Sequence, residues 1–337
     1  MIRVGIIGLG KMGLSHCSIL GAHPEVEVAG VCDTSGLVID GFKKYSSFPC
    51  YTDYKKMIDQ ANLDALLIAS PTKFHAEMVD YGLERNIHVF CEKPFVLNAA
   101  DGIRLSEKAD AKGLVNQVGY HNRFLGTFEE VRRLLEKGIL GEMYHFLAES
   151  YGPVVLREKG GTWRSEKNQG GGCLYDYASH TIDLVYFLLG KPTAVSGTML
   201  KSIFSRGVED AVYSSMELEN GLSGQLSVNW SDETHRKMTT QITVMGKKGK
   251  LIADATEVKI FLKEANLQEG LEKGWTIKYL TDLTETVDFY LRGEEYSAQL
   301  DHFISCILKK GAQNKSSFKN ATVTDQTISK LLENAKQ

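Results

Sequence analysis

Arg3-Val4-Gly5-Ile6-Ile7-Gly8-Leu9-Gly10-Lys11-Met12-Gly13 is the stretch that decides the class of fold. Its first part is a short run rich in β-branched residues, which is typical of a buried parallel strand. The strand leads into a G-x-G-x-x-G motif, whose glycines allow a tight turn, close approach to a pyrophosphate and close packing of a helix on the strand. A helical pattern follows, and its N-terminus offers free amides to phosphates. The stretch therefore predicts a dinucleotide site that includes Gly8, Gly10, Lys11, Met12 and Gly13.

The next strand supplies the acid that such a site requires. An alternating pattern from Val26 to Cys32 ends at Asp33, 20 residues after Gly13. An acid at this place accepts hydrogen bonds from the ribose hydroxyls of adenosine and repels a 2′-phosphate. Because the following Thr34-Ser35-Gly36 supplies no arginine, we expect NAD rather than NADP as the cofactor. The alternative is an aspartate that only caps the next helix.

Strand and helix patterns continue to alternate through the first third of the chain. This alternation predicts a doubly wound parallel sheet, with ligands at the carboxyl ends of its strands. After the first two strands, the expected strands are 65–69, 88–91 and 114–119. The expected helices are 75–85, 99–112 and one that ends at Ile58, capped by Asp53 or Thr52.

Three of these strand ends carry chemically capable side chains: Ser70-Pro71-Thr72, Glu92-Lys93-Pro94 and Tyr120-His121-Asn122-Arg123. Each could be ordinary turn chemistry, but three at one rim beside a dinucleotide site favour function. An ammonium at Lys93 could stabilise an alkoxide or lower the pKa of a substrate hydroxyl. The alternative is a solvated lysine. Ser70, Thr72, His75 and Glu92 are candidate cofactor contacts, and for His75 and Glu92 a capping role is equally compatible with the sequence.

The pattern changes after a helix expected at 127–136. Consecutive strands separated by short turns predict a second domain with a mainly antiparallel sheet. A long open sheet with alternating faces must be covered by other protein, and a second copy of the same chain often provides that cover. We therefore expect a homo-oligomer. The strands are expected at 143–151, 193–201, 211–218, 222–230, 238–245, 249–254 and 258–262, and terminal helices at 296–309 and 321–335.

A second candidate site lies on a helix embedded in this half. Gly170-Gly171-Gly172 precedes an apolar pattern that runs to Gly190, which predicts a helix opened and closed by glycines. Asp176, His180 and Asp183 then share one face. A histidine between carboxylates is a candidate general acid/base. The alternative is a polar helix face with a structural histidine.

A charged segment, residues 156–167, precedes this helix and contains Trp163. Its glycines and mixed charges suggest a loop over the cleft. Its four basic residues could meet a phosphate or a carboxylate of the cofactor or the substrate, or could simply be solvated. They are Arg157, Lys159, Arg164 and Lys167.

Composition excludes several classes of protein. The chain has 337 residues, 43% of them hydrophobic, which is enough for two domains. A net charge of -3 argues against a nucleic-acid surface. The six cysteines show no C-x-x-C or other metal-site spacing, so no metal is predicted. Without a signal pattern or an apolar run that could span a membrane, we expect a soluble, cytoplasmic protein without a membrane partner.

The ordered set of motifs resembles the glucose–fructose oxidoreductase/inositol dehydrogenase/rhizopine-catabolism family. The likeness covers essentially the whole chain, and Glu-Lys-Pro followed by Asp-x-x-x-His is its most specific part. It implies a Rossmann domain at 1–122 and an α/β domain at 123–337, whose open, mainly antiparallel sheet makes the subunit interface. The motifs are the glycine turn, Asp33, residues 70–75, Glu92-Lys93-Pro94, Gly171-Gly172 and Asp176 with His180.

The resemblance also implies an activity and residue roles. The expected reaction is NAD(P)-dependent oxidation or reduction of a sugar, a polyol or a nucleotide-sugar, in a homodimer or a homotetramer. Lys93 and His180 would be the catalytic pair, with Asp176 binding and orienting the substrate. Arg123, Trp163 and Arg164 fall where relatives touch cofactor or substrate. Tyrosines on both sides of Asp176 depart from the small residues common in the family, which leaves the substrate open.

Two alternatives remain beside this expectation. Some relatives of the fold are sensors that bind a dinucleotide without catalysis, although these generally lack the lysine or the histidine. The other alternative keeps the catalysis but reduces an unsaturated or imine substrate, or cycles a tightly held NAD.

Overall fold

The computed structural model describes residues 1–158, 161–309 and 311–336, and these form two compact units. The first unit consists of 1–121 and 286–322, and the second of 122–285 and 323–337. The expected division placed everything after residue 122 in one domain. The structure differs in residues 286–322, because Leu300, Phe303 and Ile304 pack in the same apolar core as Val4 and Ile6.

The first unit is built on a six-stranded parallel sheet in the order β3-β2-β1-β4-β5-β6. This order reverses direction between β1 and β4, as in doubly wound folds whose ligands lie at the switch point. The central strands are apolar and buried on both faces, as expected for a parallel sheet covered by helices. The strands are β1 (Ile2–Ile7), β2 (Val26–Cys32), β3 (Cys50–Tyr51), β4 (Ala65–Ile68), β5 (His88–Cys91) and β6 (Asn116–Val118).

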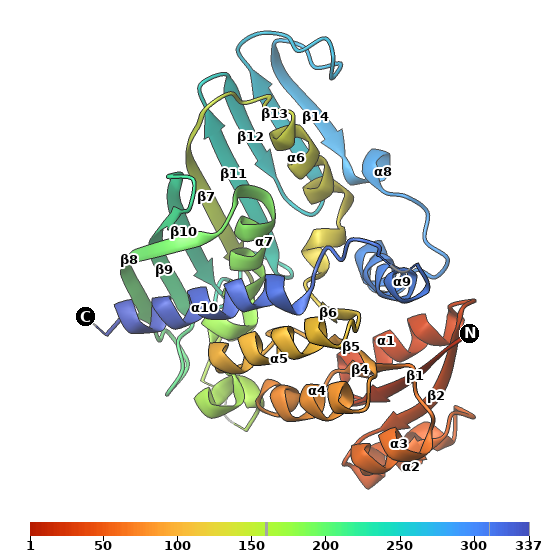
Figure 1. Ribbon diagram of the computed structural model, residues 1–337. Coiled ribbons are helices and arrows are strands. Elements are labelled where there is room, and N and C mark those ends of the chain that lie inside the picture. Colours follow the sequence, from red (N-terminus) through yellow and green to blue (C-terminus); the bar gives the residue numbers. More distant parts are fainter. Residues whose placement is uncertain (159–160, 310, 337) are drawn as a thin grey trace. The chain divides into compact units, whose positions relative to one another are not determined.

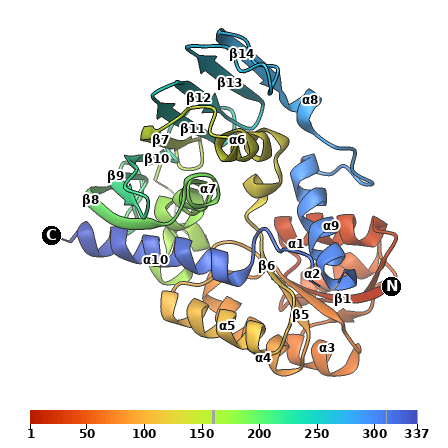
Figure 2. The ribbon, with the colours of Figure 1, turned by 45° about the horizontal axis from the view of Figure 1, so that its top comes forward.

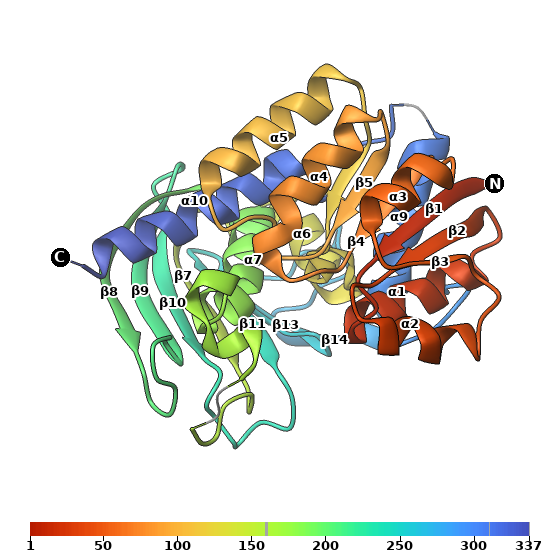
Figure 3. The same ribbon diagram turned by 90° about the horizontal axis from the view of Figure 1, so that it is seen from below.

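Helices cover both faces of this sheet (Figure 3). On one face α1 (Lys11–Ala22) and α2 (Gly36–Lys43) share a core with α9 (Glu294–Leu308), which lies beside α1 in Figure 2. On the other face are α3 (Tyr54–Gln60), α4 (His75–Glu84) and α5 (Ala99–Ala111). This arrangement confirms the predicted doubly wound class.

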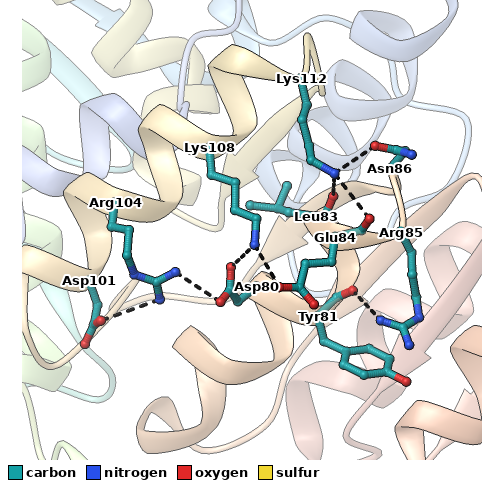
Figure 4. A network of polar contacts seen from close by, with 10 residues as sticks. All are labelled: Asp80, Tyr81, Leu83, Glu84, Arg85, Asn86, Asp101, Arg104, Lys108 and Lys112. Carbon is teal, nitrogen blue, oxygen red and sulfur yellow. Dashed lines mark hydrogen bonds and ion pairs between the residues drawn. The ribbon is translucent and has the colours of Figure 1, made fainter.

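Polar side chains cap the ends of helices on that second face. The Asp53 carboxylate accepts the amide of Lys55 at the start of α3, as its N-cap position favours. The Lys112 ammonium donates to the carbonyl oxygens of Leu83 and Glu84 at 2.8 and 3.2 Å, where α4 ends (Figure 4). A cation at this place satisfies orphan carbonyls and complements the helix dipole, and it ties the end of α5 to α4.

The second unit contains an eight-stranded sheet in the order β14-β13-β12-β11-β7-β10-β9-β8 (Figure 1). All neighbours pair antiparallel except β7 and β10, so the predicted mainly antiparallel sheet is confirmed. The strands are β7 (Met143–Tyr151), β8 (Pro192–Lys201), β9 (Ala211–Leu218), β10 (Ser223–Asn229), β11 (Thr239–Gly246), β12 (Gly249–Ala253), β13 (Glu257–Leu262) and β14 (Gly274–Tyr279).

One face of this sheet carries α6 (Gly126–Glu136) and α7 (Ser179–Leu189), which bury side chains such as Phe128 and Ile182 against Phe146 and Val244. A short helix, α8 (Leu280–Leu283), follows β14, and α10 (Phe318–Asn334) begins in the first unit and continues in the second. Within the described residues, no helix is both long and apolar enough to cross a membrane.

Candidate functional site

The glycine turn between β1 and α1 has the sterics that a dinucleotide site needs. Gly8 has a φ of +89°, and a Cβ there would lie 2.6 Å from the carbonyl oxygen of Ala69. A Cβ on Gly13 would overlap the carbonyl oxygen of Gly8, so α1 packs against the turn only without a side chain. By contrast, nothing lies within 4 Å of a Cβ built on Gly10, which leaves space for a ligand beside the backbone.

Asp33 connects the end of β2 to this turn. Its Oδ2 accepts the backbone N–H of Leu9 at 2.8 Å, and its Oδ1 accepts that of Ser35 at 2.8 Å. Each carboxylate oxygen keeps a second lone pair, so the group remains able to accept ribose hydroxyls. The residues therefore fit NAD: an open approach at Gly10 and a fixed anion at the position that binds the adenosine ribose.

His75 contacts the backbone that follows β4. This ring is 1% exposed, with Nε2 2.9 Å from the carbonyl oxygen of Ser70 and Nδ1 3.1 Å from those of Pro94 and Phe95. Burial lowers its pKa, against the opposing effect of these carbonyls. His75 therefore joins the β4 end to the segment that follows Lys93, and its contact with the cofactor stays a prediction, as do those of Ser70 and of the buried Thr72.

Lys93 lies directly after β5, half-buried, and its peptide bond to Pro94 is cis. The preceding Glu92 is buried, and its carboxylate contacts His16 on α1 at 2.5 Å. Burial opposes the charge of Glu92, but the His16 hydrogen bond and the charges of His16 and Lys93 lower its pKa below the ordinary value. The strand end thus presents a buried carboxylate beside an ammonium.

In the second unit, the helix with Asp176 and His180 is not regular. Residues Leu174–Ala178 form a π-helical turn that runs into α7. The prediction that Asp176, His180 and Asp183 share one face of a regular helix is therefore modified, because a π-turn widens the spacing. Asp176 and His180 are 5% and 4% exposed, and π-turns are frequent at functional sites.

The glycines before this helix hold another segment of the chain by backbone hydrogen bonds. The amides of Gly171 and Gly172 donate to the carbonyl oxygens of Glu166 and Arg164 at 3.0 and 3.1 Å. A Cβ on Gly171 would lie 2.5 Å from the Arg164 carbonyl oxygen. The backbone of Trp163 and Arg164 can therefore dock directly on the start of the helix.

That docking brings Arg164 to Asp176. The Arg164 Nε donates to Asp176 Oδ2 at 2.9 Å, and the guanidinium lies 4.6 Å from the centre of the Trp163 ring. The Arg164 side chain is still 43% exposed, whereas that of Asp176 is 7% exposed. Part of the charged segment thus joins the candidate site. Lys159 and Gly160 of the same segment lie outside the described residues.

Arg123 is paired with a buried carboxylate. Its guanidinium donates to both carboxylate oxygens of Asp183, from Nε at 2.8 Å and from Nη2 at 2.7 Å, and both side chains are at most 3% exposed. Burial raises the pKa of the Asp183 carboxyl, and Arg123 opposes that change. The pair fixes the segment before α6 to α7, and the assignment of Arg123 to substrate binding stays a prediction.

One functional candidate was not found from the sequence. The buried carboxylate of Glu209 accepts the amide of Leu174 at 2.9 Å, and a Cβ on Gly172 would overlap it. Burial raises the pKa of Glu209. This residue holds the first turn of the Asp176 helix, and the only signal in the sequence is an acidic pair, Glu209-Asp210, just before a strand.

The fold and the site together identify the class of protein. A doubly wound sheet with an open glycine turn and an acid at the end of β2 is characteristic of proteins that bind a nicotinamide dinucleotide. The model of an oxidoreductase family with an NAD-binding Rossmann fold matches residues 2–120. The model of the GFO/IDH/MocA C-terminal domain matches residues 128–252. The chain belongs to this family of NAD-binding oxidoreductases, as its motifs predicted.

Individual relatives support the same assignment. The chain is 26% identical to myo-inositol 2-dehydrogenase of Thermotoga maritima over 75% of both proteins. It is 29% identical to D-glucoside 3-dehydrogenase of Escherichia coli over 65% of this chain and 68% of that one. The match to the uncharacterized oxidoreductase C115.03 of Schizosaccharomyces pombe, 27% identical, spans 59% of this chain and 55% of the relative.

Solved structures share the fold over nearly the whole chain. Levoglucosan dehydrogenase in complex with NADH superposes with a TM-score of 0.89 at 19% identity, over 99% of this chain and 97% of that one. The WlbA dehydrogenase of Bordetella pertussis, in complex with NADH and UDP-GlcNAcA, gives 0.86 at 21% identity over 99% and 95%. At these identities the likeness establishes the fold.

Proposed function

We propose that this oxidoreductase transfers a hydride between nicotinamide and the hydroxyl or ketone carbon of a sugar, an inositol or a nucleotide-linked sugar. The observation that carries the proposal is the presence of both proton-handling groups, Lys93 after β5 and His180 one turn after Asp176. The relatives named as inositol and glucoside dehydrogenases support the substrate class.

NAD, when bound, supplies the hydride chemistry, and the protein supplies orientation and proton handling. The Lys93 ammonium stabilises charge on the substrate oxygen. His180 takes or returns the hydroxyl proton. Asp176, kept in place by Arg164, orients the substrate. The residues proposed to hold the cofactor are Gly8, Gly10, Lys11, Met12, Gly13, Asp33, Ser70, Thr72, His75, Glu92, Lys93, Trp163 and Arg164, and Arg123 is kept as a proposed substrate contact.

The test is absorbance at 340 nm with NAD or NADP and a panel of sugars, inositols and nucleotide-sugars. Lys93→Met and His180→Ala should each lower turnover by more than ~100-fold, because positioned proton transfer contributes 10²–10⁴. The double variant should lose little more than either single variant if both groups serve one step. Lys137→Met, at an exposed lysine directly after α6, is the matched control.

Two results would overturn the proposal. Near-normal turnover in the double variant would remove Lys93 and His180 from the chemistry. Tight NAD binding without turnover across the panel would instead favour a dinucleotide-dependent sensor.

We also propose that a second copy of the chain covers the open face of the eight-stranded sheet. On the edge strand β14, Trp275, Ile277 and Tyr279 are 56%, 44% and 52% exposed. They lie on one face, and Trp275 is paired across the ladder with Phe261. Large apolar side chains gathered on one face mark an interaction site, and a two-fold symmetric dimer is the commonest arrangement.

Light scattering after gel filtration tests this assembly. Ile277→Glu should shift a dimer or tetramer toward a smaller species, because it places a charge in the covered face. Lys201→Glu, on the opposite edge strand and already charged, is the control. A wild-type chain that is monomeric at micromolar concentration would disprove the assembly.

A further inference from the structure

The second turn of α1 carries a histidine that the proposed reaction does not use. His16 is fully buried, and its Nε2 lies 2.5 Å from Oε1 of Glu92. Its ring packs edge-on against Phe90 at 5.5 Å and lies 6.4 Å from the ring of Tyr296. The helix that opens with the glycine turn is therefore bonded to the end of the strand that carries Lys93.

The second oxygen of the Glu92 carboxylate is also hydrogen-bonded. Its Oε2 accepts the backbone N–H of Lys93 at 3.2 Å. On the β6 side, a Cβ on Gly119 would lie only 3.0 Å from Oε1, so a side chain there would push the carboxylate out of place. The carboxylate is thus enclosed by α1, by the backbone of Lys93 and by the end of β6, and it can take few other positions.

The direction of the hydrogen bond between His16 and Glu92 follows from the chemistry of the carboxylate. The Nδ1 of His16 is buried and has no hydrogen-bond partner among the described residues. An ionised carboxylate can only accept hydrogen bonds, so the ring nitrogen that faces Glu92 must carry a proton. His16 therefore donates from Nε2 to the carboxylate, a charge-assisted hydrogen bond, which is among the stronger and more directional kinds.

We propose that His16 and Glu92 are positioning residues that fix the backbone of Lys93 and hence the place of its ammonium. The inference rests on the proposed role of Lys93, adds His16 to it, and gives Glu92 a positioning role in place of a contact with the cofactor. It explains why a buried histidine and a buried carboxylate, costly to bring together in a core, are placed at this strand end. Because a misplacement of about 1 Å can cost 10²-fold in rate, loss of the pair should affect turnover more than cofactor binding.

The experiment compares His16→Gln with His16→Leu. Glutamine can still donate from Nε2 to the carboxylate, whereas leucine fills similar space without a donor. We expect kcat to fall at least ~10-fold in His16→Leu and less than ~3-fold in His16→Gln, with the Kd of NAD changed less than ~3-fold in both. His23→Leu is the matched control, since His23 directly follows α1 and contacts a carboxylate, but that of the exposed Asp301.

A second readout does not depend on activity. The rate at which acetic anhydride acetylates Lys93 is measured by peptide mass spectrometry. This rate reports how accessible the lysine amine is to the reagent. It should change at least ~3-fold in His16→Leu relative to the exposed Lys137 in the same sample, and remain near wild type in His16→Gln.

If His16→Leu does not fold, Gly119→Ala serves in its place, because its methyl group displaces the Glu92 carboxylate and leaves His16 intact. Wild-type kcat and wild-type Lys93 acetylation in a folded His16→Leu or Gly119→Ala protein would overturn the inference. That result is distinguishable from failure of the proposed function, in which Lys93→Met itself would stay active.

Discussion

Arg123 and Asp183 form a bidentate ion pair inside the second unit, with N–O distances of 2.8 and 2.7 Å and almost no exposure to solvent. Asp183 lies three residues after His180, so the pair fixes the rotation of the helix that carries the candidate base. An ion pair of this kind is weak evidence for net stability, but removal of one partner leaves a buried charge alone.

Arg123→Met should therefore destabilise the protein by about 3–5 kcal/mol, because the Asp183 carboxylate would lose its partner. Urea unfolding followed by tryptophan fluorescence measures the change. Arg132→Met, which breaks a partly exposed pair with Glu136 on α6, should cost less than about 1 kcal/mol. Equal losses in the two variants would contradict a structural role for the buried pair.

The Asp33 carboxylate, shared between the amides of Leu9 and Ser35, leads to a prediction on cofactor choice. In Asp33→Asn the charge is lost, and the amide nitrogen cannot accept a hydrogen bond. The Kd of NAD should rise ~10-fold or more, as expected for loss of hydrogen bonds to a charged group, and the preference for NAD over NADP should narrow.

Fluorescence titration with both dinucleotides measures the two dissociation constants. Asp40→Asn, at an exposed position on α2, is the control and should leave both unchanged. An unchanged ratio of the two constants in Asp33→Asn would show that Asp33 only supports the turn.

Much of this architecture could be predicted because local patterns determine it. The strand Val26–Cys32 has the predicted bounds, since a β-branched run followed by an acid is a strong local signal. The glycine turn likewise has a steric reason at each position. The sequence could not predict that 286–322 returns to the first unit, because the apolar face of α9 does not specify which sheet will bury it.

The contacts of the candidate sites depend even more on tertiary structure. The π-turn at Leu174–Ala178 has no mark in a pattern that fits a regular helix equally well. Nothing in the sequence pairs His16 with Glu92, which lie 76 residues apart. The short strand β3, the helix α2 and the edge strand β14 were also not predicted. β14 alternates half-buried and exposed residues, so it lacks the buried face that marks a strand.

The contact between Arg164 and Asp176 predicts a loss of activity without a loss of folding. In Arg164→Met the Asp176 carboxylate loses the donor that orients it, and kcat/KM should fall ~10–100-fold, the range seen when a positioning interaction is removed. The free energy of unfolding should fall less than in Arg123→Met, because the Arg164–Asp176 pair is less completely removed from water than the Arg123–Asp183 pair. Arg157→Met, in the same segment and exposed, is the control, and unchanged kcat/KM in Arg164→Met would show that this ion pair plays no part in the reaction.

Two half-buried histidines predict a loss of stability in acid. Burial lowers the pKa of His302 to about 4, assisted by the nearby charge of Lys315 and opposed by Asp301, and it lowers that of His121 to about 4 as well. An unfolded histidine has a pKa near 6.5, so between these values the unfolded chain binds more protons than the folded one. Stability contributed by the neutral rings is therefore complete above about pH 6.5 and is lost as the pH falls toward about 4, by up to about 1.4 kcal/mol per pH unit for one group.

His302→Gln isolates one of these groups. The Nε2 of His302 accepts the backbone N–H of Lys315 at 3.1 Å, and the glutamine carbonyl oxygen can accept the same hydrogen bond without titrating. The variant should match the wild type at pH 8 and be the more stable of the two at pH 5, with a shallower slope of unfolding free energy between pH 6.5 and 4.5. Urea unfolding at half-unit pH steps measures this slope. Parallel curves for the two proteins would mean that His302 takes up its proton at the same pH in the folded and the unfolded chain.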